Sequence, residues 1–95
     1  MAGKDMDEIE WNESPLLLQP NPAKDMVQLF FASSDINNAQ LSLYDLSGKL
    51  VEQHNFVTVI GENQYNWSLS HLPSGYYLVQ LNTPNTQSIQ RLIIE

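Results

Sequence analysis

Few residues in this chain have the type and spacing that catalysis requires. The two histidines, His54 and His71, lie 17 positions apart, which matches no common metal-ligand spacing. Ser47 precedes Gly48, but its neighbours do not form the Gly-x-Ser-x-Gly turn that presents a nucleophilic serine. The glycines are too scattered for a phosphate-binding loop. We therefore expect no catalytic residue, no metal ligand and no cofactor, and we expect both histidines at the surface.

Two non-catalytic binding sites remain open as alternatives. Carboxylates from separate loops could gather at one end of a β-domain and bind Ca²⁺, although the chain lacks a run of closely spaced acidic ligands. The candidate carboxylates are Asp25, Asp35, Asp45 and Glu62. The candidates for a sugar-binding aromatic platform are Tyr65, Trp67, Tyr76 and Tyr77. Three of these four occupy inward positions of their segments, which favours a core role, whereas Tyr76 is expected at the surface together with Tyr44.

The overall composition excludes several classes of protein. The chain has 95 residues, with 11 acidic side chains, 4 basic side chains and no cysteine. The net charge of −7 disfavours nucleic acid and anionic membranes as partners, because both attract Lys and Arg. Without cysteine the chain has no disulfide frame, no thiolate zinc site and no thiol nucleophile. The length suits one domain rather than a large enzyme with a substrate cleft.

The acidic charge is concentrated near the N-terminus. Residues 1–13 contain five acidic side chains and Lys4, a net charge of −4, with few apolar residues. We interpret residues 1–14 as a flexible acidic leader or linker, part of which could derive from a cloning vector, and residues 15–95 as the domain. An acidic strand or helical turn laid on the domain is the alternative. Because residues 1–7 have no apolar signal core, an exported protein would carry its export signal on a longer precursor.

From Pro15 onward, short alternating segments are separated by turn residues. No window of helix length has a 3.6-residue period, so the pattern predicts about seven strands. The segments are residues 16–19, 26–31, 40–46, 49–60, 65–69, 76–81 and 89–94. Residues 49–60 could form one strand or two bent ones, and residues 61–63 are predicted as a turn. This spacing indicates an all-β fold, an immunoglobulin-like antiparallel β-sandwich of about seven strands.

One local detail favours the immunoglobulin-like arrangement. In the segment LPSGYY, Tyr77 follows Gly75 by two residues at the start of a strand. Val79 stands two residues later, where an antibody domain has its second cysteine. Tyr77 is therefore either a tyrosine corner, whose phenol bonds to backbone a few residues upstream, or an ordinary buried tyrosine.

Three motifs in a fixed order, followed by a terminal segment, resemble a known family. They are residues 18–25 (LQPNPAKD), 43–51 (LYDLSGKLV) and 69–79 (LSHLPSGYYLV), with residues 90–95 (QRLIIE) at the end. Together they resemble the type A C-terminal sorting domain of the type IX (Por) secretion system of Gram-negative bacteria, over residues 15–95. The resemblance implies recognition residues at Pro20, Asn21, Pro22, Tyr44, Asp45, Gly48, Lys49, Pro73, Gly75, Tyr77, Arg91, Leu92, Ile93, Ile94 and Glu95. Family members often have an aromatic residue where Gln19 stands, and Lys where Arg91 stands.

The resemblance implies a secretion signal rather than an enzyme. Such domains direct a cargo protein from the periplasm across the outer membrane to the cell surface or the medium. Their implied partners are the outer-membrane type IX translocon, its shuttle protein, and a sortase-like signal peptidase at the cell surface. That peptidase cuts upstream of the folded part and can attach the cargo to lipopolysaccharide. The acidic segment before Pro15 is the matching region here.

The quoted residues also suggest physical roles. Residues 20–22 would form an extended segment leading into the domain, with few backbone hydrogen-bond donors. A partner could bind such a segment at a low cost in conformational entropy. Residues 92–94 would form a terminal strand that is either paired within the domain or free to extend another sheet, including that of a second copy in a homodimer. The alternatives are that these motifs only maintain the fold, or that the domain is a ligand-binding module or a structural spacer.

Overall fold

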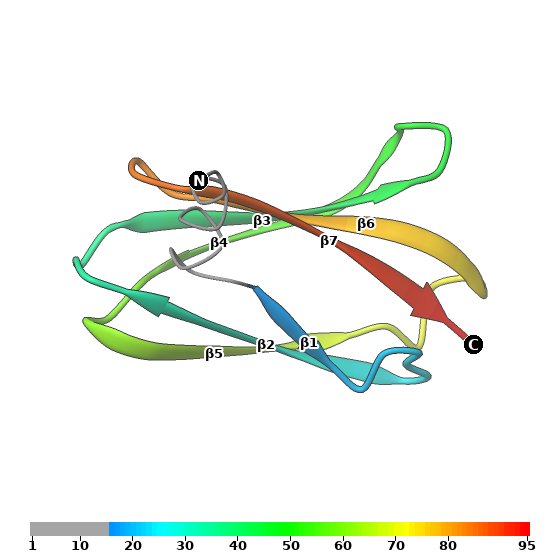
Figure 1. The fold of residues 1–95 in the computed structure, drawn as a ribbon. Helices are drawn as coiled ribbons and strands as arrows, with labels where there is room; N and C mark the ends of the chain where they lie inside the picture. The colour runs from blue at the N-terminus through cyan, green and yellow to red at the C-terminus, as the bar shows by residue number, and fades with distance from the viewer. Residues whose placement is uncertain (1–15) are drawn as a thin grey trace, which may run out of the picture.

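The computed structural model describes residues 16–95, which form two antiparallel sheets packed face to face (Figure 1). The interpretation of residues 1–14 as a leader lies outside the described residues. The strands are β1 (Leu17–Gln19), β2 (Met26–Ser33), β3 (Asn38–Asp45), β4 (Leu50–Val57), β5 (Gly61–Ser68), β6 (Gly75–Asn82) and β7 (Gln87–Ile94). One sheet has the order β1-β2-β5 and the other β4-β3-β6-β7. The predicted all-β sandwich of seven strands is confirmed.

The core lies between the two sheets and follows the alternation in the sequence. In β2, Val27, Leu29 and Phe31 are buried, and in β6 the inward residues Val79 and Leu81 are fully buried. A strand places alternate side chains on opposite faces, so this pattern fixes which face of each sheet points inward. Further core side chains are Leu16, Leu18, Ala23, Ala39, Leu41, Leu43, Trp67, Leu69, Tyr77, Leu92 and Ile94.

The prediction for residues 49–63 was partly wrong. Residues 50–57 form one strand, β4, but residues 61–63 begin β5 instead of forming a turn. The turn falls at residues 58–60, because the Asn63 side chain closes it. Its Oδ1 accepts a hydrogen bond from the Val59 amide at 2.8 Å, and its Nδ2 donates to the Val59 carbonyl at 3.0 Å. Gly61 supports the bend with a φ of 100°.

The connections between strands lie at the two ends of the sandwich, and β2–β3, β4–β5 and β5–β6 cross from one sheet to the other (Figure 1). The connections β1–β2, β3–β4 and β5–β6 and the C-terminus lie at one end, which is the right side of Figure 1. The connections β2–β3, β4–β5 and β6–β7 lie at the other end. Residues 16–95 contain no helix long and apolar enough to cross a membrane.

Candidate functional site

The motifs singled out in the sequence meet at one end of the sandwich, which we call the motif end. It comprises residues 20–23, 45–49, 73–77 and 91–95. The strand registers bring these segments together, because Asp45 pairs with Tyr77 and Gly75 pairs with Ile94. An isolated parallel bridge between Ala23 and Ile94 joins the first motif to the last strand. Segments more than seventy residues apart in the chain are therefore neighbours in space.

The Asn21 side chain fastens the first motif to the terminal strand. Its Nδ2 donates a hydrogen bond to the Arg91 carbonyl at 2.8 Å, across a sequence separation of 70 residues. Its Oδ1 accepts a hydrogen bond from the Ile93 amide at 3.1 Å. The backbone N–H and C=O of one residue in a neighbouring strand would make the same pair of bonds to an exposed edge. The side-chain amide thus takes the place of a strand residue, and we call this contact the Asn21 clamp.

Ala23 continues the clamp along the same edge of β7. Its amide donates to the Ile93 carbonyl at 2.8 Å, and the Glu95 amide donates to the Ala23 carbonyl at 2.7 Å. Residues 91–94 therefore pair with β6 on one side, and residues 21–23 bond to the other side of this stretch. Of the two alternatives for the terminal strand, the structure shows the paired one for this stretch.

The expectation of an extended approach at residues 20–22 was wrong. The chain bends at each of these positions, and the peptide bonds before Pro20 and Pro22 are both cis. The bend has a simple geometrical reason. After β1 in one sheet, the chain must reach the edge of β7 in the other sheet before it returns to start β2.

The second motif forms a tight turn between β3 and β4. Asp45 Oδ1 accepts hydrogen bonds from the Ser47 hydroxyl at 2.6 Å, the Ser47 amide at 2.9 Å and the Lys49 amide at 3.0 Å. The bond from the Ser47 hydroxyl, with that from the Lys49 amide, holds the pKa of Asp45 below its ordinary value. Gly48 has a φ of 91°, which a residue with a Cβ rarely adopts. Residues 46–48 thus form the turn between β3 and β4.

The third motif contains a tyrosine corner. The buried Tyr77 side chain donates its hydroxyl hydrogen to the Pro73 carbonyl at 2.6 Å, four residues upstream. This bond fixes the loop before β6 against the strand that follows it. Of the two readings of Tyr77, the structure supports the corner.

The predicted recognition residues divide into two groups by exposure. Tyr77, Leu92 and Ile94 are buried in the core, and Tyr44, Asp45, Gly75 and Ile93 are partly buried. The exposed group consists of Pro20, Asn21, Pro22, Gly48, Lys49, Pro73, Arg91 and Glu95. The exposed side chains are accessible at the surface of the folded domain, whereas Tyr77, Leu92 and Ile94 pack in its core.

The two alternative binding sites are not assembled. Asp25 and Asp45 lie at the motif end, whereas Asp35 and Glu62 lie near the other end, so the four carboxylates form no cage. Within residues 16–95, no group of three or more acidic or histidine side chains is arranged to hold a metal ion. Trp67 and Tyr77 are buried and Tyr65 is partly buried, which leaves no aromatic platform.

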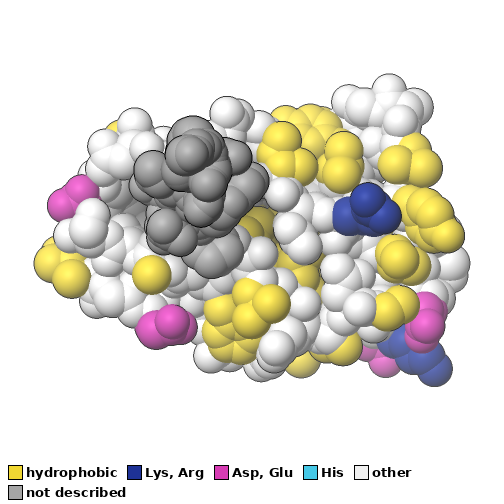
Figure 2. Space-filling model, viewed as in Figure 1, with side chains coloured by type: hydrophobic (Ala, Val, Ile, Leu, Met, Phe, Trp, Pro, Cys, Tyr) yellow, Lys and Arg dark blue, Asp and Glu magenta, His cyan; other side chains and the backbone are white. Residues whose placement is uncertain are grey.

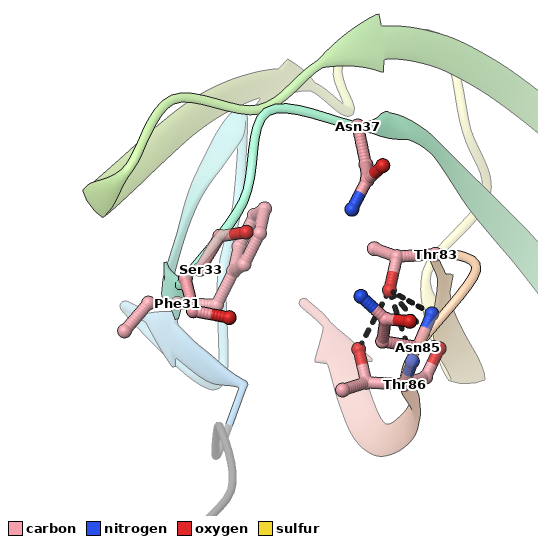
Figure 3. A pocket seen from close by; sticks show the side chains of 8 residues that line it. Phe31, Ser33, Asn37, Thr83, Asn85 and Thr86 are labelled. Atoms are coloured by element: carbon pink, nitrogen blue, oxygen red, sulfur yellow. Dashed lines mark hydrogen bonds between the residues drawn. The ribbon is translucent and has the colours of Figure 1, made fainter.

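A hollow of about 440 Å³ lies at the end opposite the motifs (Figure 3). Its wall carries polar side chains from two turns, and Asn37 points toward it. The Thr83 hydroxyl already accepts hydrogen bonds from the amides of Asn85 and Thr86 and lies 2.9 Å from the Thr86 hydroxyl. These groups stabilise the β6–β7 turn, and none of the predicted recognition residues lines the hollow.

Sequence reasoning missed a polar cluster around Glu52 that joins β4 to β5, the edge strands of the two sheets on one side. Glu52 Oε1 accepts a hydrogen bond from Trp67 Nε1 at 2.7 Å. Its Oε2 lies 3.0 Å from His71 Nε2 and 3.8 Å from His54 Nε2, and His54 Nδ1 is hydrogen-bonded to the Tyr65 hydroxyl. Both histidines therefore lie beside the same carboxylate, that of Glu52. No motif or spacing in the sequence pointed to Glu52.

Glu52 should make stability depend on pH in the acidic range. Burial alone would raise its pKa, but the bonds from Trp67 and His71 hold the pKa of Glu52 below the ordinary value of 4.5. A carboxyl with a lowered folded pKa stabilises the fold fully above its unfolded pKa, and this contribution disappears as pH falls through the folded pKa. We expect Glu52→Gln to lower the free energy of unfolding by about 1–3 kcal/mol at pH 7.

Urea unfolding at a series of pH values from 7 to 3 tests this expectation. The difference between wild type and Glu52→Gln should shrink once the pH drops below about 4.5. Glu62→Gln is the matched control, because Glu62 is exposed and makes no side-chain hydrogen bond to another described residue. A difference that stays constant over the whole pH range would contradict the assigned role of Glu52.

Comparisons with known proteins agree with the geometry. The model of the family "Secretion system C-terminal sorting domain" matches residues 18–95. No curated protein matches the chain by sequence. Among solved structures, a part of dimeric latent PorU from Porphyromonas gingivalis has a similar fold, with a TM-score of 0.69 and 20% sequence identity. The match covers 85% of this chain but 9% of that one. The chain therefore belongs to the family of secretion system C-terminal sorting domains, which are the C-terminal secretion signals of the type IX system.

Proposed function

We propose that residues 15–95 are a removable secretion signal that the type IX machinery recognises at the motif end. The outer-membrane translocon and its shuttle protein would bind this end and carry the attached cargo from the periplasm to the cell surface or the medium. The domain itself would have no catalytic activity. The proposal rests chiefly on one observation: four segments far apart in the sequence converge at one end, where Asn21 ties the first of them to the last.

Processing is expected on the N-terminal side of the sandwich. Leu16 and Leu18 are buried in the core, so a peptidase would cut before them if it leaves the folded domain intact. Residues 1–13, with a net charge of −4, are the proposed substrate for a sortase-like signal peptidase. Cutting there would release the cargo and leave the signal domain as a separate piece.

An export assay tests the proposed function. The whole 95-residue chain is fused to the C-terminus of a periplasmic reporter, in a host with the type IX system and in the same host without a working translocon. We expect the reporter in the medium or at the cell surface only in the first host. If the reporter stays in the periplasm of that host, while an established signal of the same family exports it, the proposed function is wrong.

A further inference from the structure

Four carboxamide side chains gather on the outer face of the sheet β4-β3-β6-β7, near the end opposite the motifs. The strand registers place Asn55 of β4 and Asn82 of β6 on either side of Gln40 in β3. Paired residues of antiparallel strands project from the same face, so these three side chains form a line across three strands. Asn38 lies two residues before Gln40 in β3 and points to the same side. We call these four residues the amide cluster.

A second hollow, of about 570 Å³, lies over the amide cluster. Its volume is within the range of small-molecule sites. The carboxamides line it together with two apolar residues, Pro84 and Val57, of which Val57 is 60% exposed. No residue that lines this hollow carries a charge, although Figure 2 shows acidic and basic side chains elsewhere on the surface. A ligand of this hollow is therefore expected to be uncharged.

Most of the hydrogen-bonding capacity of the amide cluster is unused. A carboxamide offers two donor hydrogens and an oxygen with two lone pairs. Within the part of the chain that the structure describes, Gln40 Nε2 donates to Asn55 Oδ1 at 3.3 Å, and the side chains of Asn38 and Asn82 make no hydrogen bond. A ligand that covers these groups must supply partners for them, because a buried amide without a partner costs free energy.

A neutral saccharide meets these requirements. Its hydroxyls donate and accept as the carboxamides do, and the CH groups of its rings can pack on Val57 and Pro84. A peptide fits less well, because β3 and β6 are paired on both sides and offer no free backbone groups under the hollow. An anionic ligand would meet no Lys or Arg among the residues that line it.

We propose that the amide cluster is a binding site for a neutral polysaccharide, whose chain lies across β4, β3 and β6. A saccharide that extends beyond the hollow also reaches Gln53 and Gln80, which flank Ser42 in the next row of the same face. The site uses none of the four aromatic residues that the sequence suggested as a sugar platform. It lies away from the motif end, so it is independent of the proposed function.

NMR titration of the isotope-labelled 95-residue chain tests the site, because the side-chain NH₂ groups of Asn and Gln give their own signals. The probes are neutral hexasaccharides of glucose, xylose and mannose. With at least one of them, the NH₂ signals of Gln40, Asn55 and Asn82 should shift and saturate with a Kd in the millimolar range, as expected for an open surface site. The signals of Gln64 and Asn66 should not shift, because both residues lie on β5 in the other sheet.

A matched pair of variants tests the role of the carboxamides. Gln40→Ala should weaken binding of the same hexasaccharide about fivefold or more, since it removes a hydrogen-bonding group. Gln64→Ala is the control, because Gln64 Nε2 also donates to an asparagine, Asn66 Oδ1, at 3.2 Å. Both variants lose the same kind of exposed contact, so their melting temperatures should be similar, and only Gln40→Ala should change binding.

Several results would overturn this inference. One is that none of the hexasaccharides shifts the signals of the amide cluster, and another is that Gln64→Ala weakens binding as much as Gln40→Ala. Tighter binding of an anionic polysaccharide, polygalacturonate, would show that the ligand class is wrong. Shifts that follow protein concentration alone would show that the hollow binds a second copy instead. Export is not measured in this experiment, so each of these results leaves the proposed function standing.

Discussion

Removal of residues 91–95 is expected to abolish export and also to unfold the domain. Leu92 is fully buried and Ile94 is 3% exposed, so the truncation takes two large side chains out of the core. Each such loss costs about 2–5 kcal/mol, against a total stability of about 5–15 kcal/mol for a domain. The truncation also removes the acceptors and donors that hold Asn21 and Ala23. Circular dichroism and thermal unfolding of the truncated chain, with the export assay beside them, measure both effects.

Lost export alone would not separate recognition from folding, so the truncation needs a matched control. Leu81→Ala removes a fully buried side chain from β6, at a position away from the motif end. It should destabilise the domain by about 2–5 kcal/mol, yet it leaves every exposed motif residue in place. For each variant, export is divided by the fraction of folded protein. We expect this ratio to be higher for Leu81→Ala than for the truncated chain. A truncated chain that melts at the wild-type temperature would contradict the packing role assigned to Leu92 and Ile94.

The strands could be predicted because their signal is local. Alternation of buried and exposed residues identified β2, β3 and β6 to within a few residues, and Tyr77 two positions after Gly75 suggested the tyrosine corner. Both signals depend only on neighbours in the sequence. The β4–β5 boundary was misplaced because a specific side-chain contact, not the position of the glycine, sets the turn. The Asn63 side chain bonds to the backbone of Val59, four residues upstream, and so closes a turn at residues 58–60. In the sequence, Gly61 suggested a turn at residues 61–63, which is three positions too late.

The contacts that build the site could not be predicted in this way. Asn21 lies between two prolines, and in the sequence it resembles an ordinary turn residue. Its partners are 70 and 72 residues away, and no periodicity encodes such a pairing. Glu52 is similar, because its bond to Trp67 forms between the edge strands of two different sheets. The motif residues were identified through family resemblance. That they lie together at one end of the domain could be seen only in the folded structure.

The clamp gives a physical reason for an asparagine at this position. An edge strand presents a carbonyl and an amide in alternation, and only a side-chain amide both donates and accepts with suitable geometry. Aspartate could accept from the Ile93 amide, but it could not donate to the Arg91 carbonyl and would place a negative charge beside it. We therefore expect Asn21→Asp to lower the free energy of unfolding by about 1–2 kcal/mol. Asn66→Asp should change it by less than about 0.5 kcal/mol, because the new carboxylate still accepts the bond that Gln64 donates.

Hydrogen exchange should show where the Asn21→Asp effect lies. The Ile93 and Glu95 amides, which are held by Asn21 and Ala23, should exchange about tenfold faster for each 1.4 kcal/mol lost locally. Amides in β2 and β5, which pair in the other sheet, should change only if the whole domain is destabilised. Export should fall together with the local protection, because an unclamped β7 no longer presents the first and last motifs in a fixed arrangement. Faster exchange of Ile93 with undiminished export would show that the clamp serves the fold and not recognition.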